Sequence, residues 1–184
     1  DRVKRIAEMF SAAGKTITTD DLWGERWSKM VTNCMINATA AMTGLMSHEV
    51  RADREARSQM INLAVETIKV GKSLGYNVKP PMPGFTLENL EDALGDSGNE
   101  HLDEVLSGST PAVPGLPSMA QDVNKGRKTE IEHLNGLVSK TGKEMGIPTP
   151  YNDAVVQIIR GIESGEFMVA KENLKRVDSM TGGK

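Results

Sequence analysis

The apolar residues of this chain recur at the spacing of an α-helix, and no segment alternates apolar and polar residues with the period of two that marks a strand. The clearest helical stretch precedes Gly44, and its apolar stripe consists of Trp27, Met30, Val31, Cys34, Met35 and Ala38. Asp20 or Asp21 can cap the start of this helix, and Gly44 can end it. The pattern predicts an all-α domain.

Further helices are predicted along the chain, each bounded by glycine, proline or a capping residue. They cover residues 1–13, 53–75, 118–125, 129–146, 151–164 and 165–177. Asp53 opens the second of these, and Ser118 is the predicted cap of the helix over 118–125. Pro148 and Pro150 predict an extended connector between two of the later helices.

Residues 79–117 differ in composition from the rest of the chain. They hold six of the eight prolines, and seven acidic residues against a single basic residue, Lys79. This composition is typical of a long surface connection. We expect short helices near 86–95 and 99–107 within a solvated loop, and a lid or a partner-docking segment is the alternative.

Composition excludes several classes of protein. Of 184 residues, 26% are charged and the net charge is −3, so the basic excess of a nucleic-acid binder is absent. No apolar run approaches the roughly 20 residues of a membrane helix. The single cysteine, Cys34, excludes an internal disulfide framework, and His48, His101 and His133 lack the spacing of metal ligands. We therefore expect no metal site and a cytoplasmic location.

One predicted helix carries an unusual row of polar residues. Lys29, Asn33 and Asn37 recur four residues apart, so they share one face over roughly 12 Å. Asparagine is unfavourable in the middle of a helix, which suggests that something compensates for it. A solvated face is one interpretation, and a row of donors for an anionic ligand with a carbonyl group is the other.

A second polar group lies between residues 118 and 130. Ser118 at a helix start would present a hydroxyl and free backbone N–H groups, which suit a carboxylate. Asp122 and Glu130 can be ordinary acids near helix starts, and capping alone accounts for this group. Cys34 lies on the helix about 100° from the row at Lys29, which predicts a core position.

Taken together, these stretches resemble the C-terminal domain of the ketopantoate reductase (2-dehydropantoate 2-reductase) family. The resemblance is carried by residues 27–40, 118–123, 126–136 and 146–152. It implies an all-α fold of the 6-phosphogluconate dehydrogenase C-terminal-like type over residues 1–184, with a proline-rich acidic insert at 79–117.

The resemblance also implies an activity for a longer parent protein. Members of the family reduce the ketone of 2-dehydropantoate to (R)-pantoate with NADPH, a step of pantothenate biosynthesis. They bind NADPH mainly on an N-terminal Rossmann domain, which this chain lacks. Because the chain starts at Asp1 within a predicted helix, we expect it to be part of a longer protein and to be inactive alone.

Position by position, the resemblance assigns roles to five residues. Lys29 matches the catalytic lysine, a general acid that would donate a proton to the ketone oxygen. Glu130 matches the acid that positions this lysine and the bound substrate or cofactor. The substrate-binding positions of the family are matched by Asn33, Asn37 and Ser118.

The remaining expectations concern support, substrate and partners. Asp122 matches a recurrent position of the family and is a candidate supporting residue. The expected partner is a small 2-oxo acid, and the resemblance allows a homodimer. Two alternatives stay open: a reductase of another 2-oxo acid, and a non-catalytic dimerisation or binding module, if the natural chain has no Rossmann domain.

Overall fold

The computed structural model describes residues 2–82, 84–85, 98–108 and 114–182. It contains the α-helices α1 (Arg2–Ser11), α2 (Leu22–Thr43), α3 (Ser47–Ala52), α4 (Arg54–Ser73), α6 (Gly98–Gly108), α7 (Ser118–Asn124), α8 (Asn135–Met145), α9 (Pro150–Ser164) and α10 (Asn173–Thr181). A short 3₁₀ helix, η1, covers Ile131–His133. The described residues include no strand, and the predicted all-α class is confirmed.

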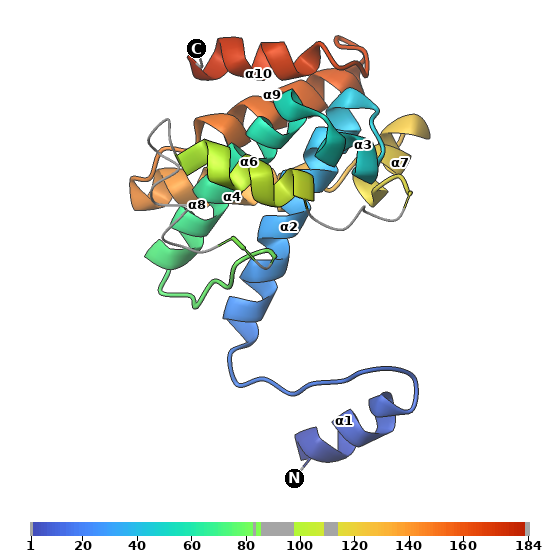
Figure 1. Ribbon diagram of the computed structural model, residues 1–184, viewed down its shortest axis with the longest axis vertical. Coiled ribbons are helices and arrows are strands. Elements are labelled where there is room, and N and C mark those ends of the chain that lie inside the picture. Colours follow the sequence, from blue (N-terminus) through green and yellow to red (C-terminus); the bar gives the residue numbers. More distant parts are fainter. Residues whose placement is uncertain (1, 83, 86–97, 109–113, 183–184) are drawn as a thin grey trace.

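The long helix α2 runs through the bundle and packs against α4, α7 and α9 (Figure 1). The Asp21 side chain caps its start by accepting a hydrogen bond from the backbone N–H of Gly24 at 2.9 Å. Gly44 ends it with a φ of 78°, a left-handed conformation that favours glycine. Both predicted boundaries of this helix are confirmed.

Helix α4 contacts the Trp27 side chain of α2. The Trp27 ring Nε1–H donates to the Thr67 carbonyl at 2.8 Å, which satisfies the polar edge of a buried indole. A Cβ at Gly71 would lie 2.3 Å from the same ring, so this contact requires glycine. Asp53 caps the start of α4, as predicted, by accepting from the Ala56 N–H at 3.0 Å.

Part of the acidic segment 79–117 contributes to the core through Phe85, Leu102 and Leu106, which corrects the expectation of a solvated loop there, although many of its other described residues are exposed. The predicted helix at 99–107 is confirmed as α6, which packs on α4 and buries Leu102 and Leu106. Asp103 accepts from the Arg57 guanidinium at 2.6 and 3.0 Å, so an acid of this segment is used for anchoring. The helix predicted at 86–95 lies outside the described residues.

The single helix predicted over 129–146 is wrong, because the chain forms η1 and α8 there. The backbone of Leu134 has φ −108° and ψ −98°, outside the helical region. The next residue, Asn135, is fully buried and donates its side-chain N–H to the Cys34 carbonyl of α2 at 3.3 Å. A contact with a distant helix therefore accompanies the break.

The last helix also begins later than predicted, at Asn173 rather than near Gly165. The Asn173 side chain donates to the carbonyls of Met42 and Met168 at 2.8 and 2.9 Å. These bonds fix the turn before α10 against the end of α2. The helix predicted over 151–164 is confirmed as α9.

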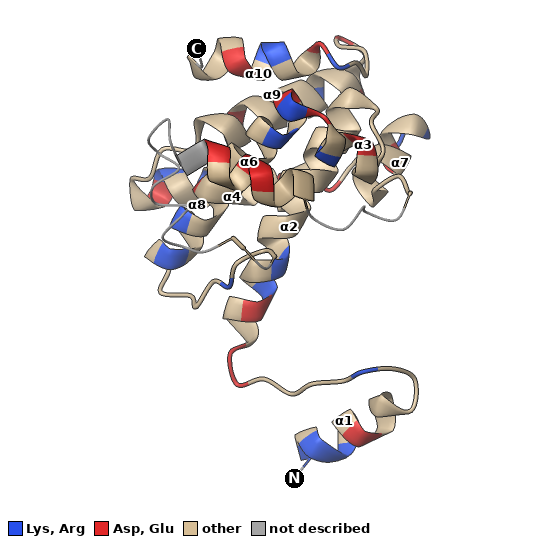
Figure 2. Cartoon of the chain, in the orientation of Figure 1, with Lys and Arg blue, Asp and Glu red and all other residues tan. Residues whose placement is uncertain are grey.

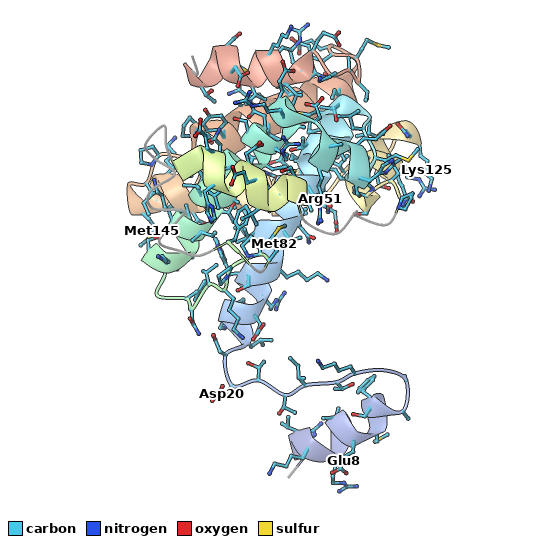
Figure 3. All side chains as sticks on the ribbon, viewed as in Figure 1. Glu8, Asp20, Arg51, Met82, Lys125 and Met145 are labelled. Carbon is cyan, nitrogen blue, oxygen red and sulfur yellow. The ribbon has the colours of Figure 1, made fainter. Side chains whose placement is uncertain are left out.

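The predicted helix over 1–13 is confirmed as α1, which lies apart from the bundle at the end of an extended connector (Figure 1). Its side chains, Glu8 among them, are well separated from those of the bundle (Figure 3). Val3, Ile6 and Phe10 on this helix are 57%, 42% and 64% exposed. The bundle described above therefore forms its core without α1.

Candidate functional site

The polar row of α2 lies at the edge of the bundle. Lys29 is exposed, and Asn33 and Asn37 are half-buried, whereas Val31 and Cys34 between them are fully buried. No hydrogen bond or ion pair joins the three polar side chains to another residue in the described ranges. In Figure 2 the charged residues of α2 gather on its N-terminal half, and the half that is deepest in the bundle carries none. The row is thus available to a ligand.

A pocket of about 560 Å³ opens beside this row. Its walls come from α2, from the turn after α4, and from η1 with α8. They comprise Trp23, Arg26, Trp27, Lys29, Met30, Asn33, Leu74, Tyr76, His133, Leu134, Leu137, Thr141 and Glu144. Lys29 and Asn33 therefore place an ammonium and an amide at an otherwise largely apolar cavity.

Three aromatic rings form one wall of this pocket. The rings of Trp23 and Tyr76 are stacked with centroids 6.2 Å apart and an interplanar angle of 13°. Trp27 meets the same tyrosine at 5.6 Å with a tilt of 51°. The Arg26 guanidinium lies 5.2 Å from the centroid of Trp23, a cation–π contact. Sequence analysis did not assign Trp23, Tyr76 or His133 to a site, because no motif links them.

Ser118 is the first residue of α7 rather than its cap, which corrects the predicted capping role. Pro117 holds the cap position, and no side chain bonds to the helix start. Ser118 is exposed, while the next two residues, Met119 and Ala120, are buried where α7 packs on α2. The serine hydroxyl is therefore not used in capping.

Glu130 and Asp122 both contribute their backbone carbonyls to turns. The Glu130 carbonyl accepts from the N–H groups of His133 and Leu134 at 2.9 and 3.1 Å, which closes η1. The Asp122 carbonyl accepts from the Arg127 N–H at 2.9 Å. Glu130 is exposed and Asp122 is half-buried. The structure thus brings Lys29 and Asn33 together in the pocket, whose walls do not include Asn37, Ser118, Asp122 or Glu130.

A buried polar network, which sequence analysis missed, links α4, α8 and α9 to α2. Glu66 of α4 accepts from the backbone N–H groups of Tyr151 and Asn152, both at 2.9 Å, and from the Asn152 side chain at 2.7 Å. The Asn152 side chain accepts in turn from the Asn135 side chain at 2.9 Å. The Asn135 side chain also donates to the Cys34 carbonyl. Burial raises the pKa of Glu66 to about 7, although its hydrogen bonds act in the opposite direction.

Cys34 is a fully buried residue of α2. Burial raises the pKa of the Cys34 thiol to about 12, so it stays protonated and is a core residue rather than a nucleophile, as predicted.

The described part of the chain contains no group of three or more histidine, cysteine or acidic side chains that could hold a metal ion. Within the same residues, no helix has the length and apolar character needed to cross a membrane.

The fold and this site define a class: an α-helical domain whose longest described helix presents Lys29 and Asn33 at a pocket. Residues 21–163 match the family model described as ketopantoate reductase PanE/ApbA C terminal. Because this match covers most of the chain, the chain belongs to the ketopantoate reductase family and represents its C-terminal domain.

Curated relatives extend the match over nearly the whole chain. A 2-dehydropantoate 2-reductase from Pyrobaculum aerophilum is 29% identical over 163 residues, which are 88% of this chain and 52% of that protein. One from Mesorhizobium japonicum is 30% identical over 161 residues, 87% of this chain and 43% of that protein. The chain therefore spans about half the length of these relatives.

Solved structures share the fold. The PanE/ApbA family ketopantoate reductase from Ralstonia eutropha JMP134 aligns with a TM-score of 0.66 and 27% identity, covering 89% of this chain and 49% of that one. D-mandelate dehydrogenase in a ternary complex with NADH and anilino(oxo)acetate aligns with a TM-score of 0.70 and 21% identity, covering 90% and 49%. A dimeric ketopantoate reductase from Staphylococcus aureus aligns with a TM-score of 0.64 and 17% identity, covering 91% and 52%.

Proposed function

We propose that this chain is the substrate-binding, catalytic half of an NADPH-dependent reductase that converts 2-dehydropantoate to (R)-pantoate in the cytoplasm. The observation that carries the proposal is the placement of Lys29 and Asn33 side by side at the pocket of a ketopantoate reductase domain. The names of the curated relatives support the substrate. The dimeric Staphylococcus aureus relative supports a homodimer as the assembly.

Lys29 is the proposed general acid. When a hydride reaches the ketone carbon, negative charge develops on the ketone oxygen, and an ammonium within hydrogen-bond reach stabilises that charge and donates the proton. Lys29 has no internal partner among the described residues, so its ammonium is free to meet the substrate. The reduced nicotinamide supplies the hydride when it is bound.

The other residues orient the substrate around Lys29. Asn33 and Asn37 donate amide N–H groups along the same helix face, and Ser118 offers its uncommitted hydroxyl to the substrate carboxylate. Glu130 positions the lysine and the substrate relative to each other. The Asp122 carbonyl stabilises the turn that precedes Glu130. These side chains fit the nicotinamide end of NADPH, whereas the chain has no glycine-rich loop for its phosphates.

Replacement of the lysine tests this proposal. In the complete protein we expect Lys29→Ala to lower kcat about 100-fold or more while KM changes far less, because the ammonium acts mainly in the transition state. Lys175→Ala, an exposed lysine of α10, is the matched control and keeps wild-type turnover. NADPH oxidation monitored with 2-dehydropantoate gives both constants. An unchanged rate in Lys29→Ala would contradict the assignment.

The aromatic wall favours a second candidate, a reductase of a 2-oxo acid with a larger apolar side chain. Trp23, Trp27 and Tyr76 line the cavity that contains Lys29, and such a wall suits an aromatic or branched side chain. The complex of D-mandelate dehydrogenase with anilino(oxo)acetate shows an aromatic 2-oxo acid derivative bound to a protein of this fold. A panel of 2-oxo acids separates the two: the higher kcat/KM identifies the substrate.

A further inference from the structure

Glu163, in the last turn of α9, binds the chain immediately before Glu130. Its Oε1 accepts from both the backbone N–H and the hydroxyl of Thr129, each at 2.8 Å. Its Oε2 accepts from the Lys128 ammonium at 2.8 Å. The Glu163 side chain is only 7% exposed. A buried carboxylate thus uses both oxygens on two consecutive residues of another segment.

The charge of Glu163 belongs to this arrangement. Burial acts to raise the pKa of its carboxyl, but the Lys128 ammonium and the two Thr129 donors outweigh burial and hold the pKa below its ordinary value. Glu163 is therefore ionised at neutral pH, and its hydrogen bonds are of the stronger, charge-assisted kind.

These bonds control a segment that has no helix of its own. Residues 127–130 form no helix, and Gly126 before them adopts a φ of 64°. The Thr129 hydroxyl, held by Glu163, also accepts from the Ile131 N–H at 3.2 Å. Glu130 thus lies between a residue bound to α9 and the closed turn of η1, which fixes the point from which its side chain leaves the backbone.

Helix α9 is itself fixed to the helix that carries Lys29. It packs against α2, and its start is held by Glu66 and by the Asn152–Asn135 bond that leads to the Cys34 carbonyl. A continuous set of contacts therefore runs from α2, through α9, to the backbone beside Glu130.

We propose that Glu163 is a positioning residue, which holds Glu130 at the correct place relative to Lys29; the inference rests on the proposed function. Misplacement of a catalytic group by about 1 Å can cost about 100-fold in rate. Without Glu163, Thr129 loses two bonds, and the segment before Glu130 is no longer held by α9. The exposed Glu132–Arg160 pair then remains as a link between η1 and α9 on the other side of Glu130.

The experiment compares kcat and KM of three variants of the complete protein. Glu163→Ala removes all three bonds and should lower kcat about 10- to 100-fold, with KM changed less than about threefold. Glu163→Gln keeps Oε1 for Thr129 and loses only the Lys128 bond, so it should stay within about threefold of wild type. Thr129→Val, which removes the hydroxyl bonds to Glu163 and to the Ile131 N–H but keeps the backbone bond to Glu163, should give an intermediate loss and remains informative if Glu163→Ala does not fold.

A double-mutant cycle distinguishes positioning from general structural damage. In a Glu130→Gln background, Glu163→Ala should change kcat less than about twofold, since the residue through which it acts is already disabled. Glu166→Gln is the matched control: the side chain of this exposed acid, just after α9, bonds to no described residue, so its kcat stays at wild type.

The outcomes separate this inference from the proposed function. If the wild-type protein reduces no 2-oxo acid, the proposed function fails. If wild type is active but Glu163→Gln loses as much as Glu163→Ala, or the loss persists in the Glu130→Gln background, only the positioning role is overturned. Amide hydrogen exchange does not depend on activity. The exchange rate of the Thr129 N–H should rise in Glu163→Ala and not in Glu163→Gln. Equal rates in the two variants would also overturn the positioning role.

Discussion

The two ends of α9 are each held by a buried glutamate, and the two carboxylates behave in opposite ways. Glu66 meets the start of the helix with uncharged donors, and burial raises its pKa to about 7. Glu163, near the other end, faces the Lys128 ammonium as well as Thr129, and its pKa lies below the ordinary value. Glu66 is the more deeply buried of the two and has no cation beside it, so the difference in burial and the Lys128 ammonium together account for the opposite directions of the pKa shifts.

The comparison suggests different roles for the two residues. Glu66 lies in the network that joins α4, α8 and α9 behind the polar row, where its loss would disturb packing. Glu163 lies beside a surface segment that leads to Glu130, where its loss would disturb the proposed site. Loss of Glu66 should therefore lower mainly the free energy of unfolding, whereas loss of Glu163 should lower mainly the turnover rate.

The largest effect on stability is expected for Glu66→Ala. It leaves the N–H groups of Tyr151 and Asn152 and the Asn152 side chain without their acceptor, and we expect a loss of about 4 kcal/mol in the free energy of unfolding. Urea unfolding followed by circular dichroism measures it. Glu55→Ala, an acid more than half exposed on the same helix, is the control and should change little. Equal losses in both variants would remove Glu66 from the network.

The pH dependence of stability should differ between the two carboxylates. The folded-state pKa of Glu66 is raised to about 7 from an ordinary 4.5, so the folded protein keeps a proton that the unfolded chain releases. Its contribution to the free energy of unfolding therefore falls as pH rises from about 4.5 to 7, by on the order of 2 to 3 kcal/mol. Below pH 4.5 the lowered pKa of Glu163 gives the opposite slope.

Denaturant titrations between pH 3 and pH 8 measure this profile. In Glu66→Gln, which does not titrate, the decline between about pH 4.5 and 7 should disappear relative to wild type. In Glu163→Gln, the decline toward acid should become shallower instead. If the wild-type and Glu66→Gln curves are parallel, the pKa of Glu66 is not raised.

The smallest effect is expected when the cation beside Glu163 is removed. Lys128→Met should raise the pKa of the Glu163 carboxyl toward that of Glu66, because burial then acts with less opposition. The Lys128 side chain is 84% exposed, so stability should hardly change. An NMR titration of the Glu163 carboxyl carbon gives the value, with Lys125→Met as the control. An unshifted pKa would show that the Thr129 bonds alone hold it down.

Sequence patterns predicted the long helices well because their signals are local. The caps at Asp21 and Asp53 bond to backbone groups three residues away, and Gly44 ends α2 through its own backbone freedom. The apolar stripe that includes Val31 and Cys34 is buried as its period requires. The polar row at Lys29 was visible for the same reason, since residues four apart must share a helix face.

Tertiary contacts decided what the patterns missed. The break at Leu134, the late start of α10 at Asn173 and the burial of α6 all coincide with bonds to residues far along the chain. No local sequence pattern predicts that Glu66 accepts hydrogen bonds, because its backbone donors lie 85 and 86 residues later in the chain.

The chain alone thus determined an all-α domain, the main helix boundaries, and a lysine and two asparagines on one helix face. Only the folded structure decided which residues line the pocket beside Lys29. It also decided which groups bind Glu66 and Glu163 at the two ends of α9. The physical reason is range: propensity, capping and periodicity act over about four residues, whereas the charge state of a buried carboxylate depends on groups that only packing brings to it.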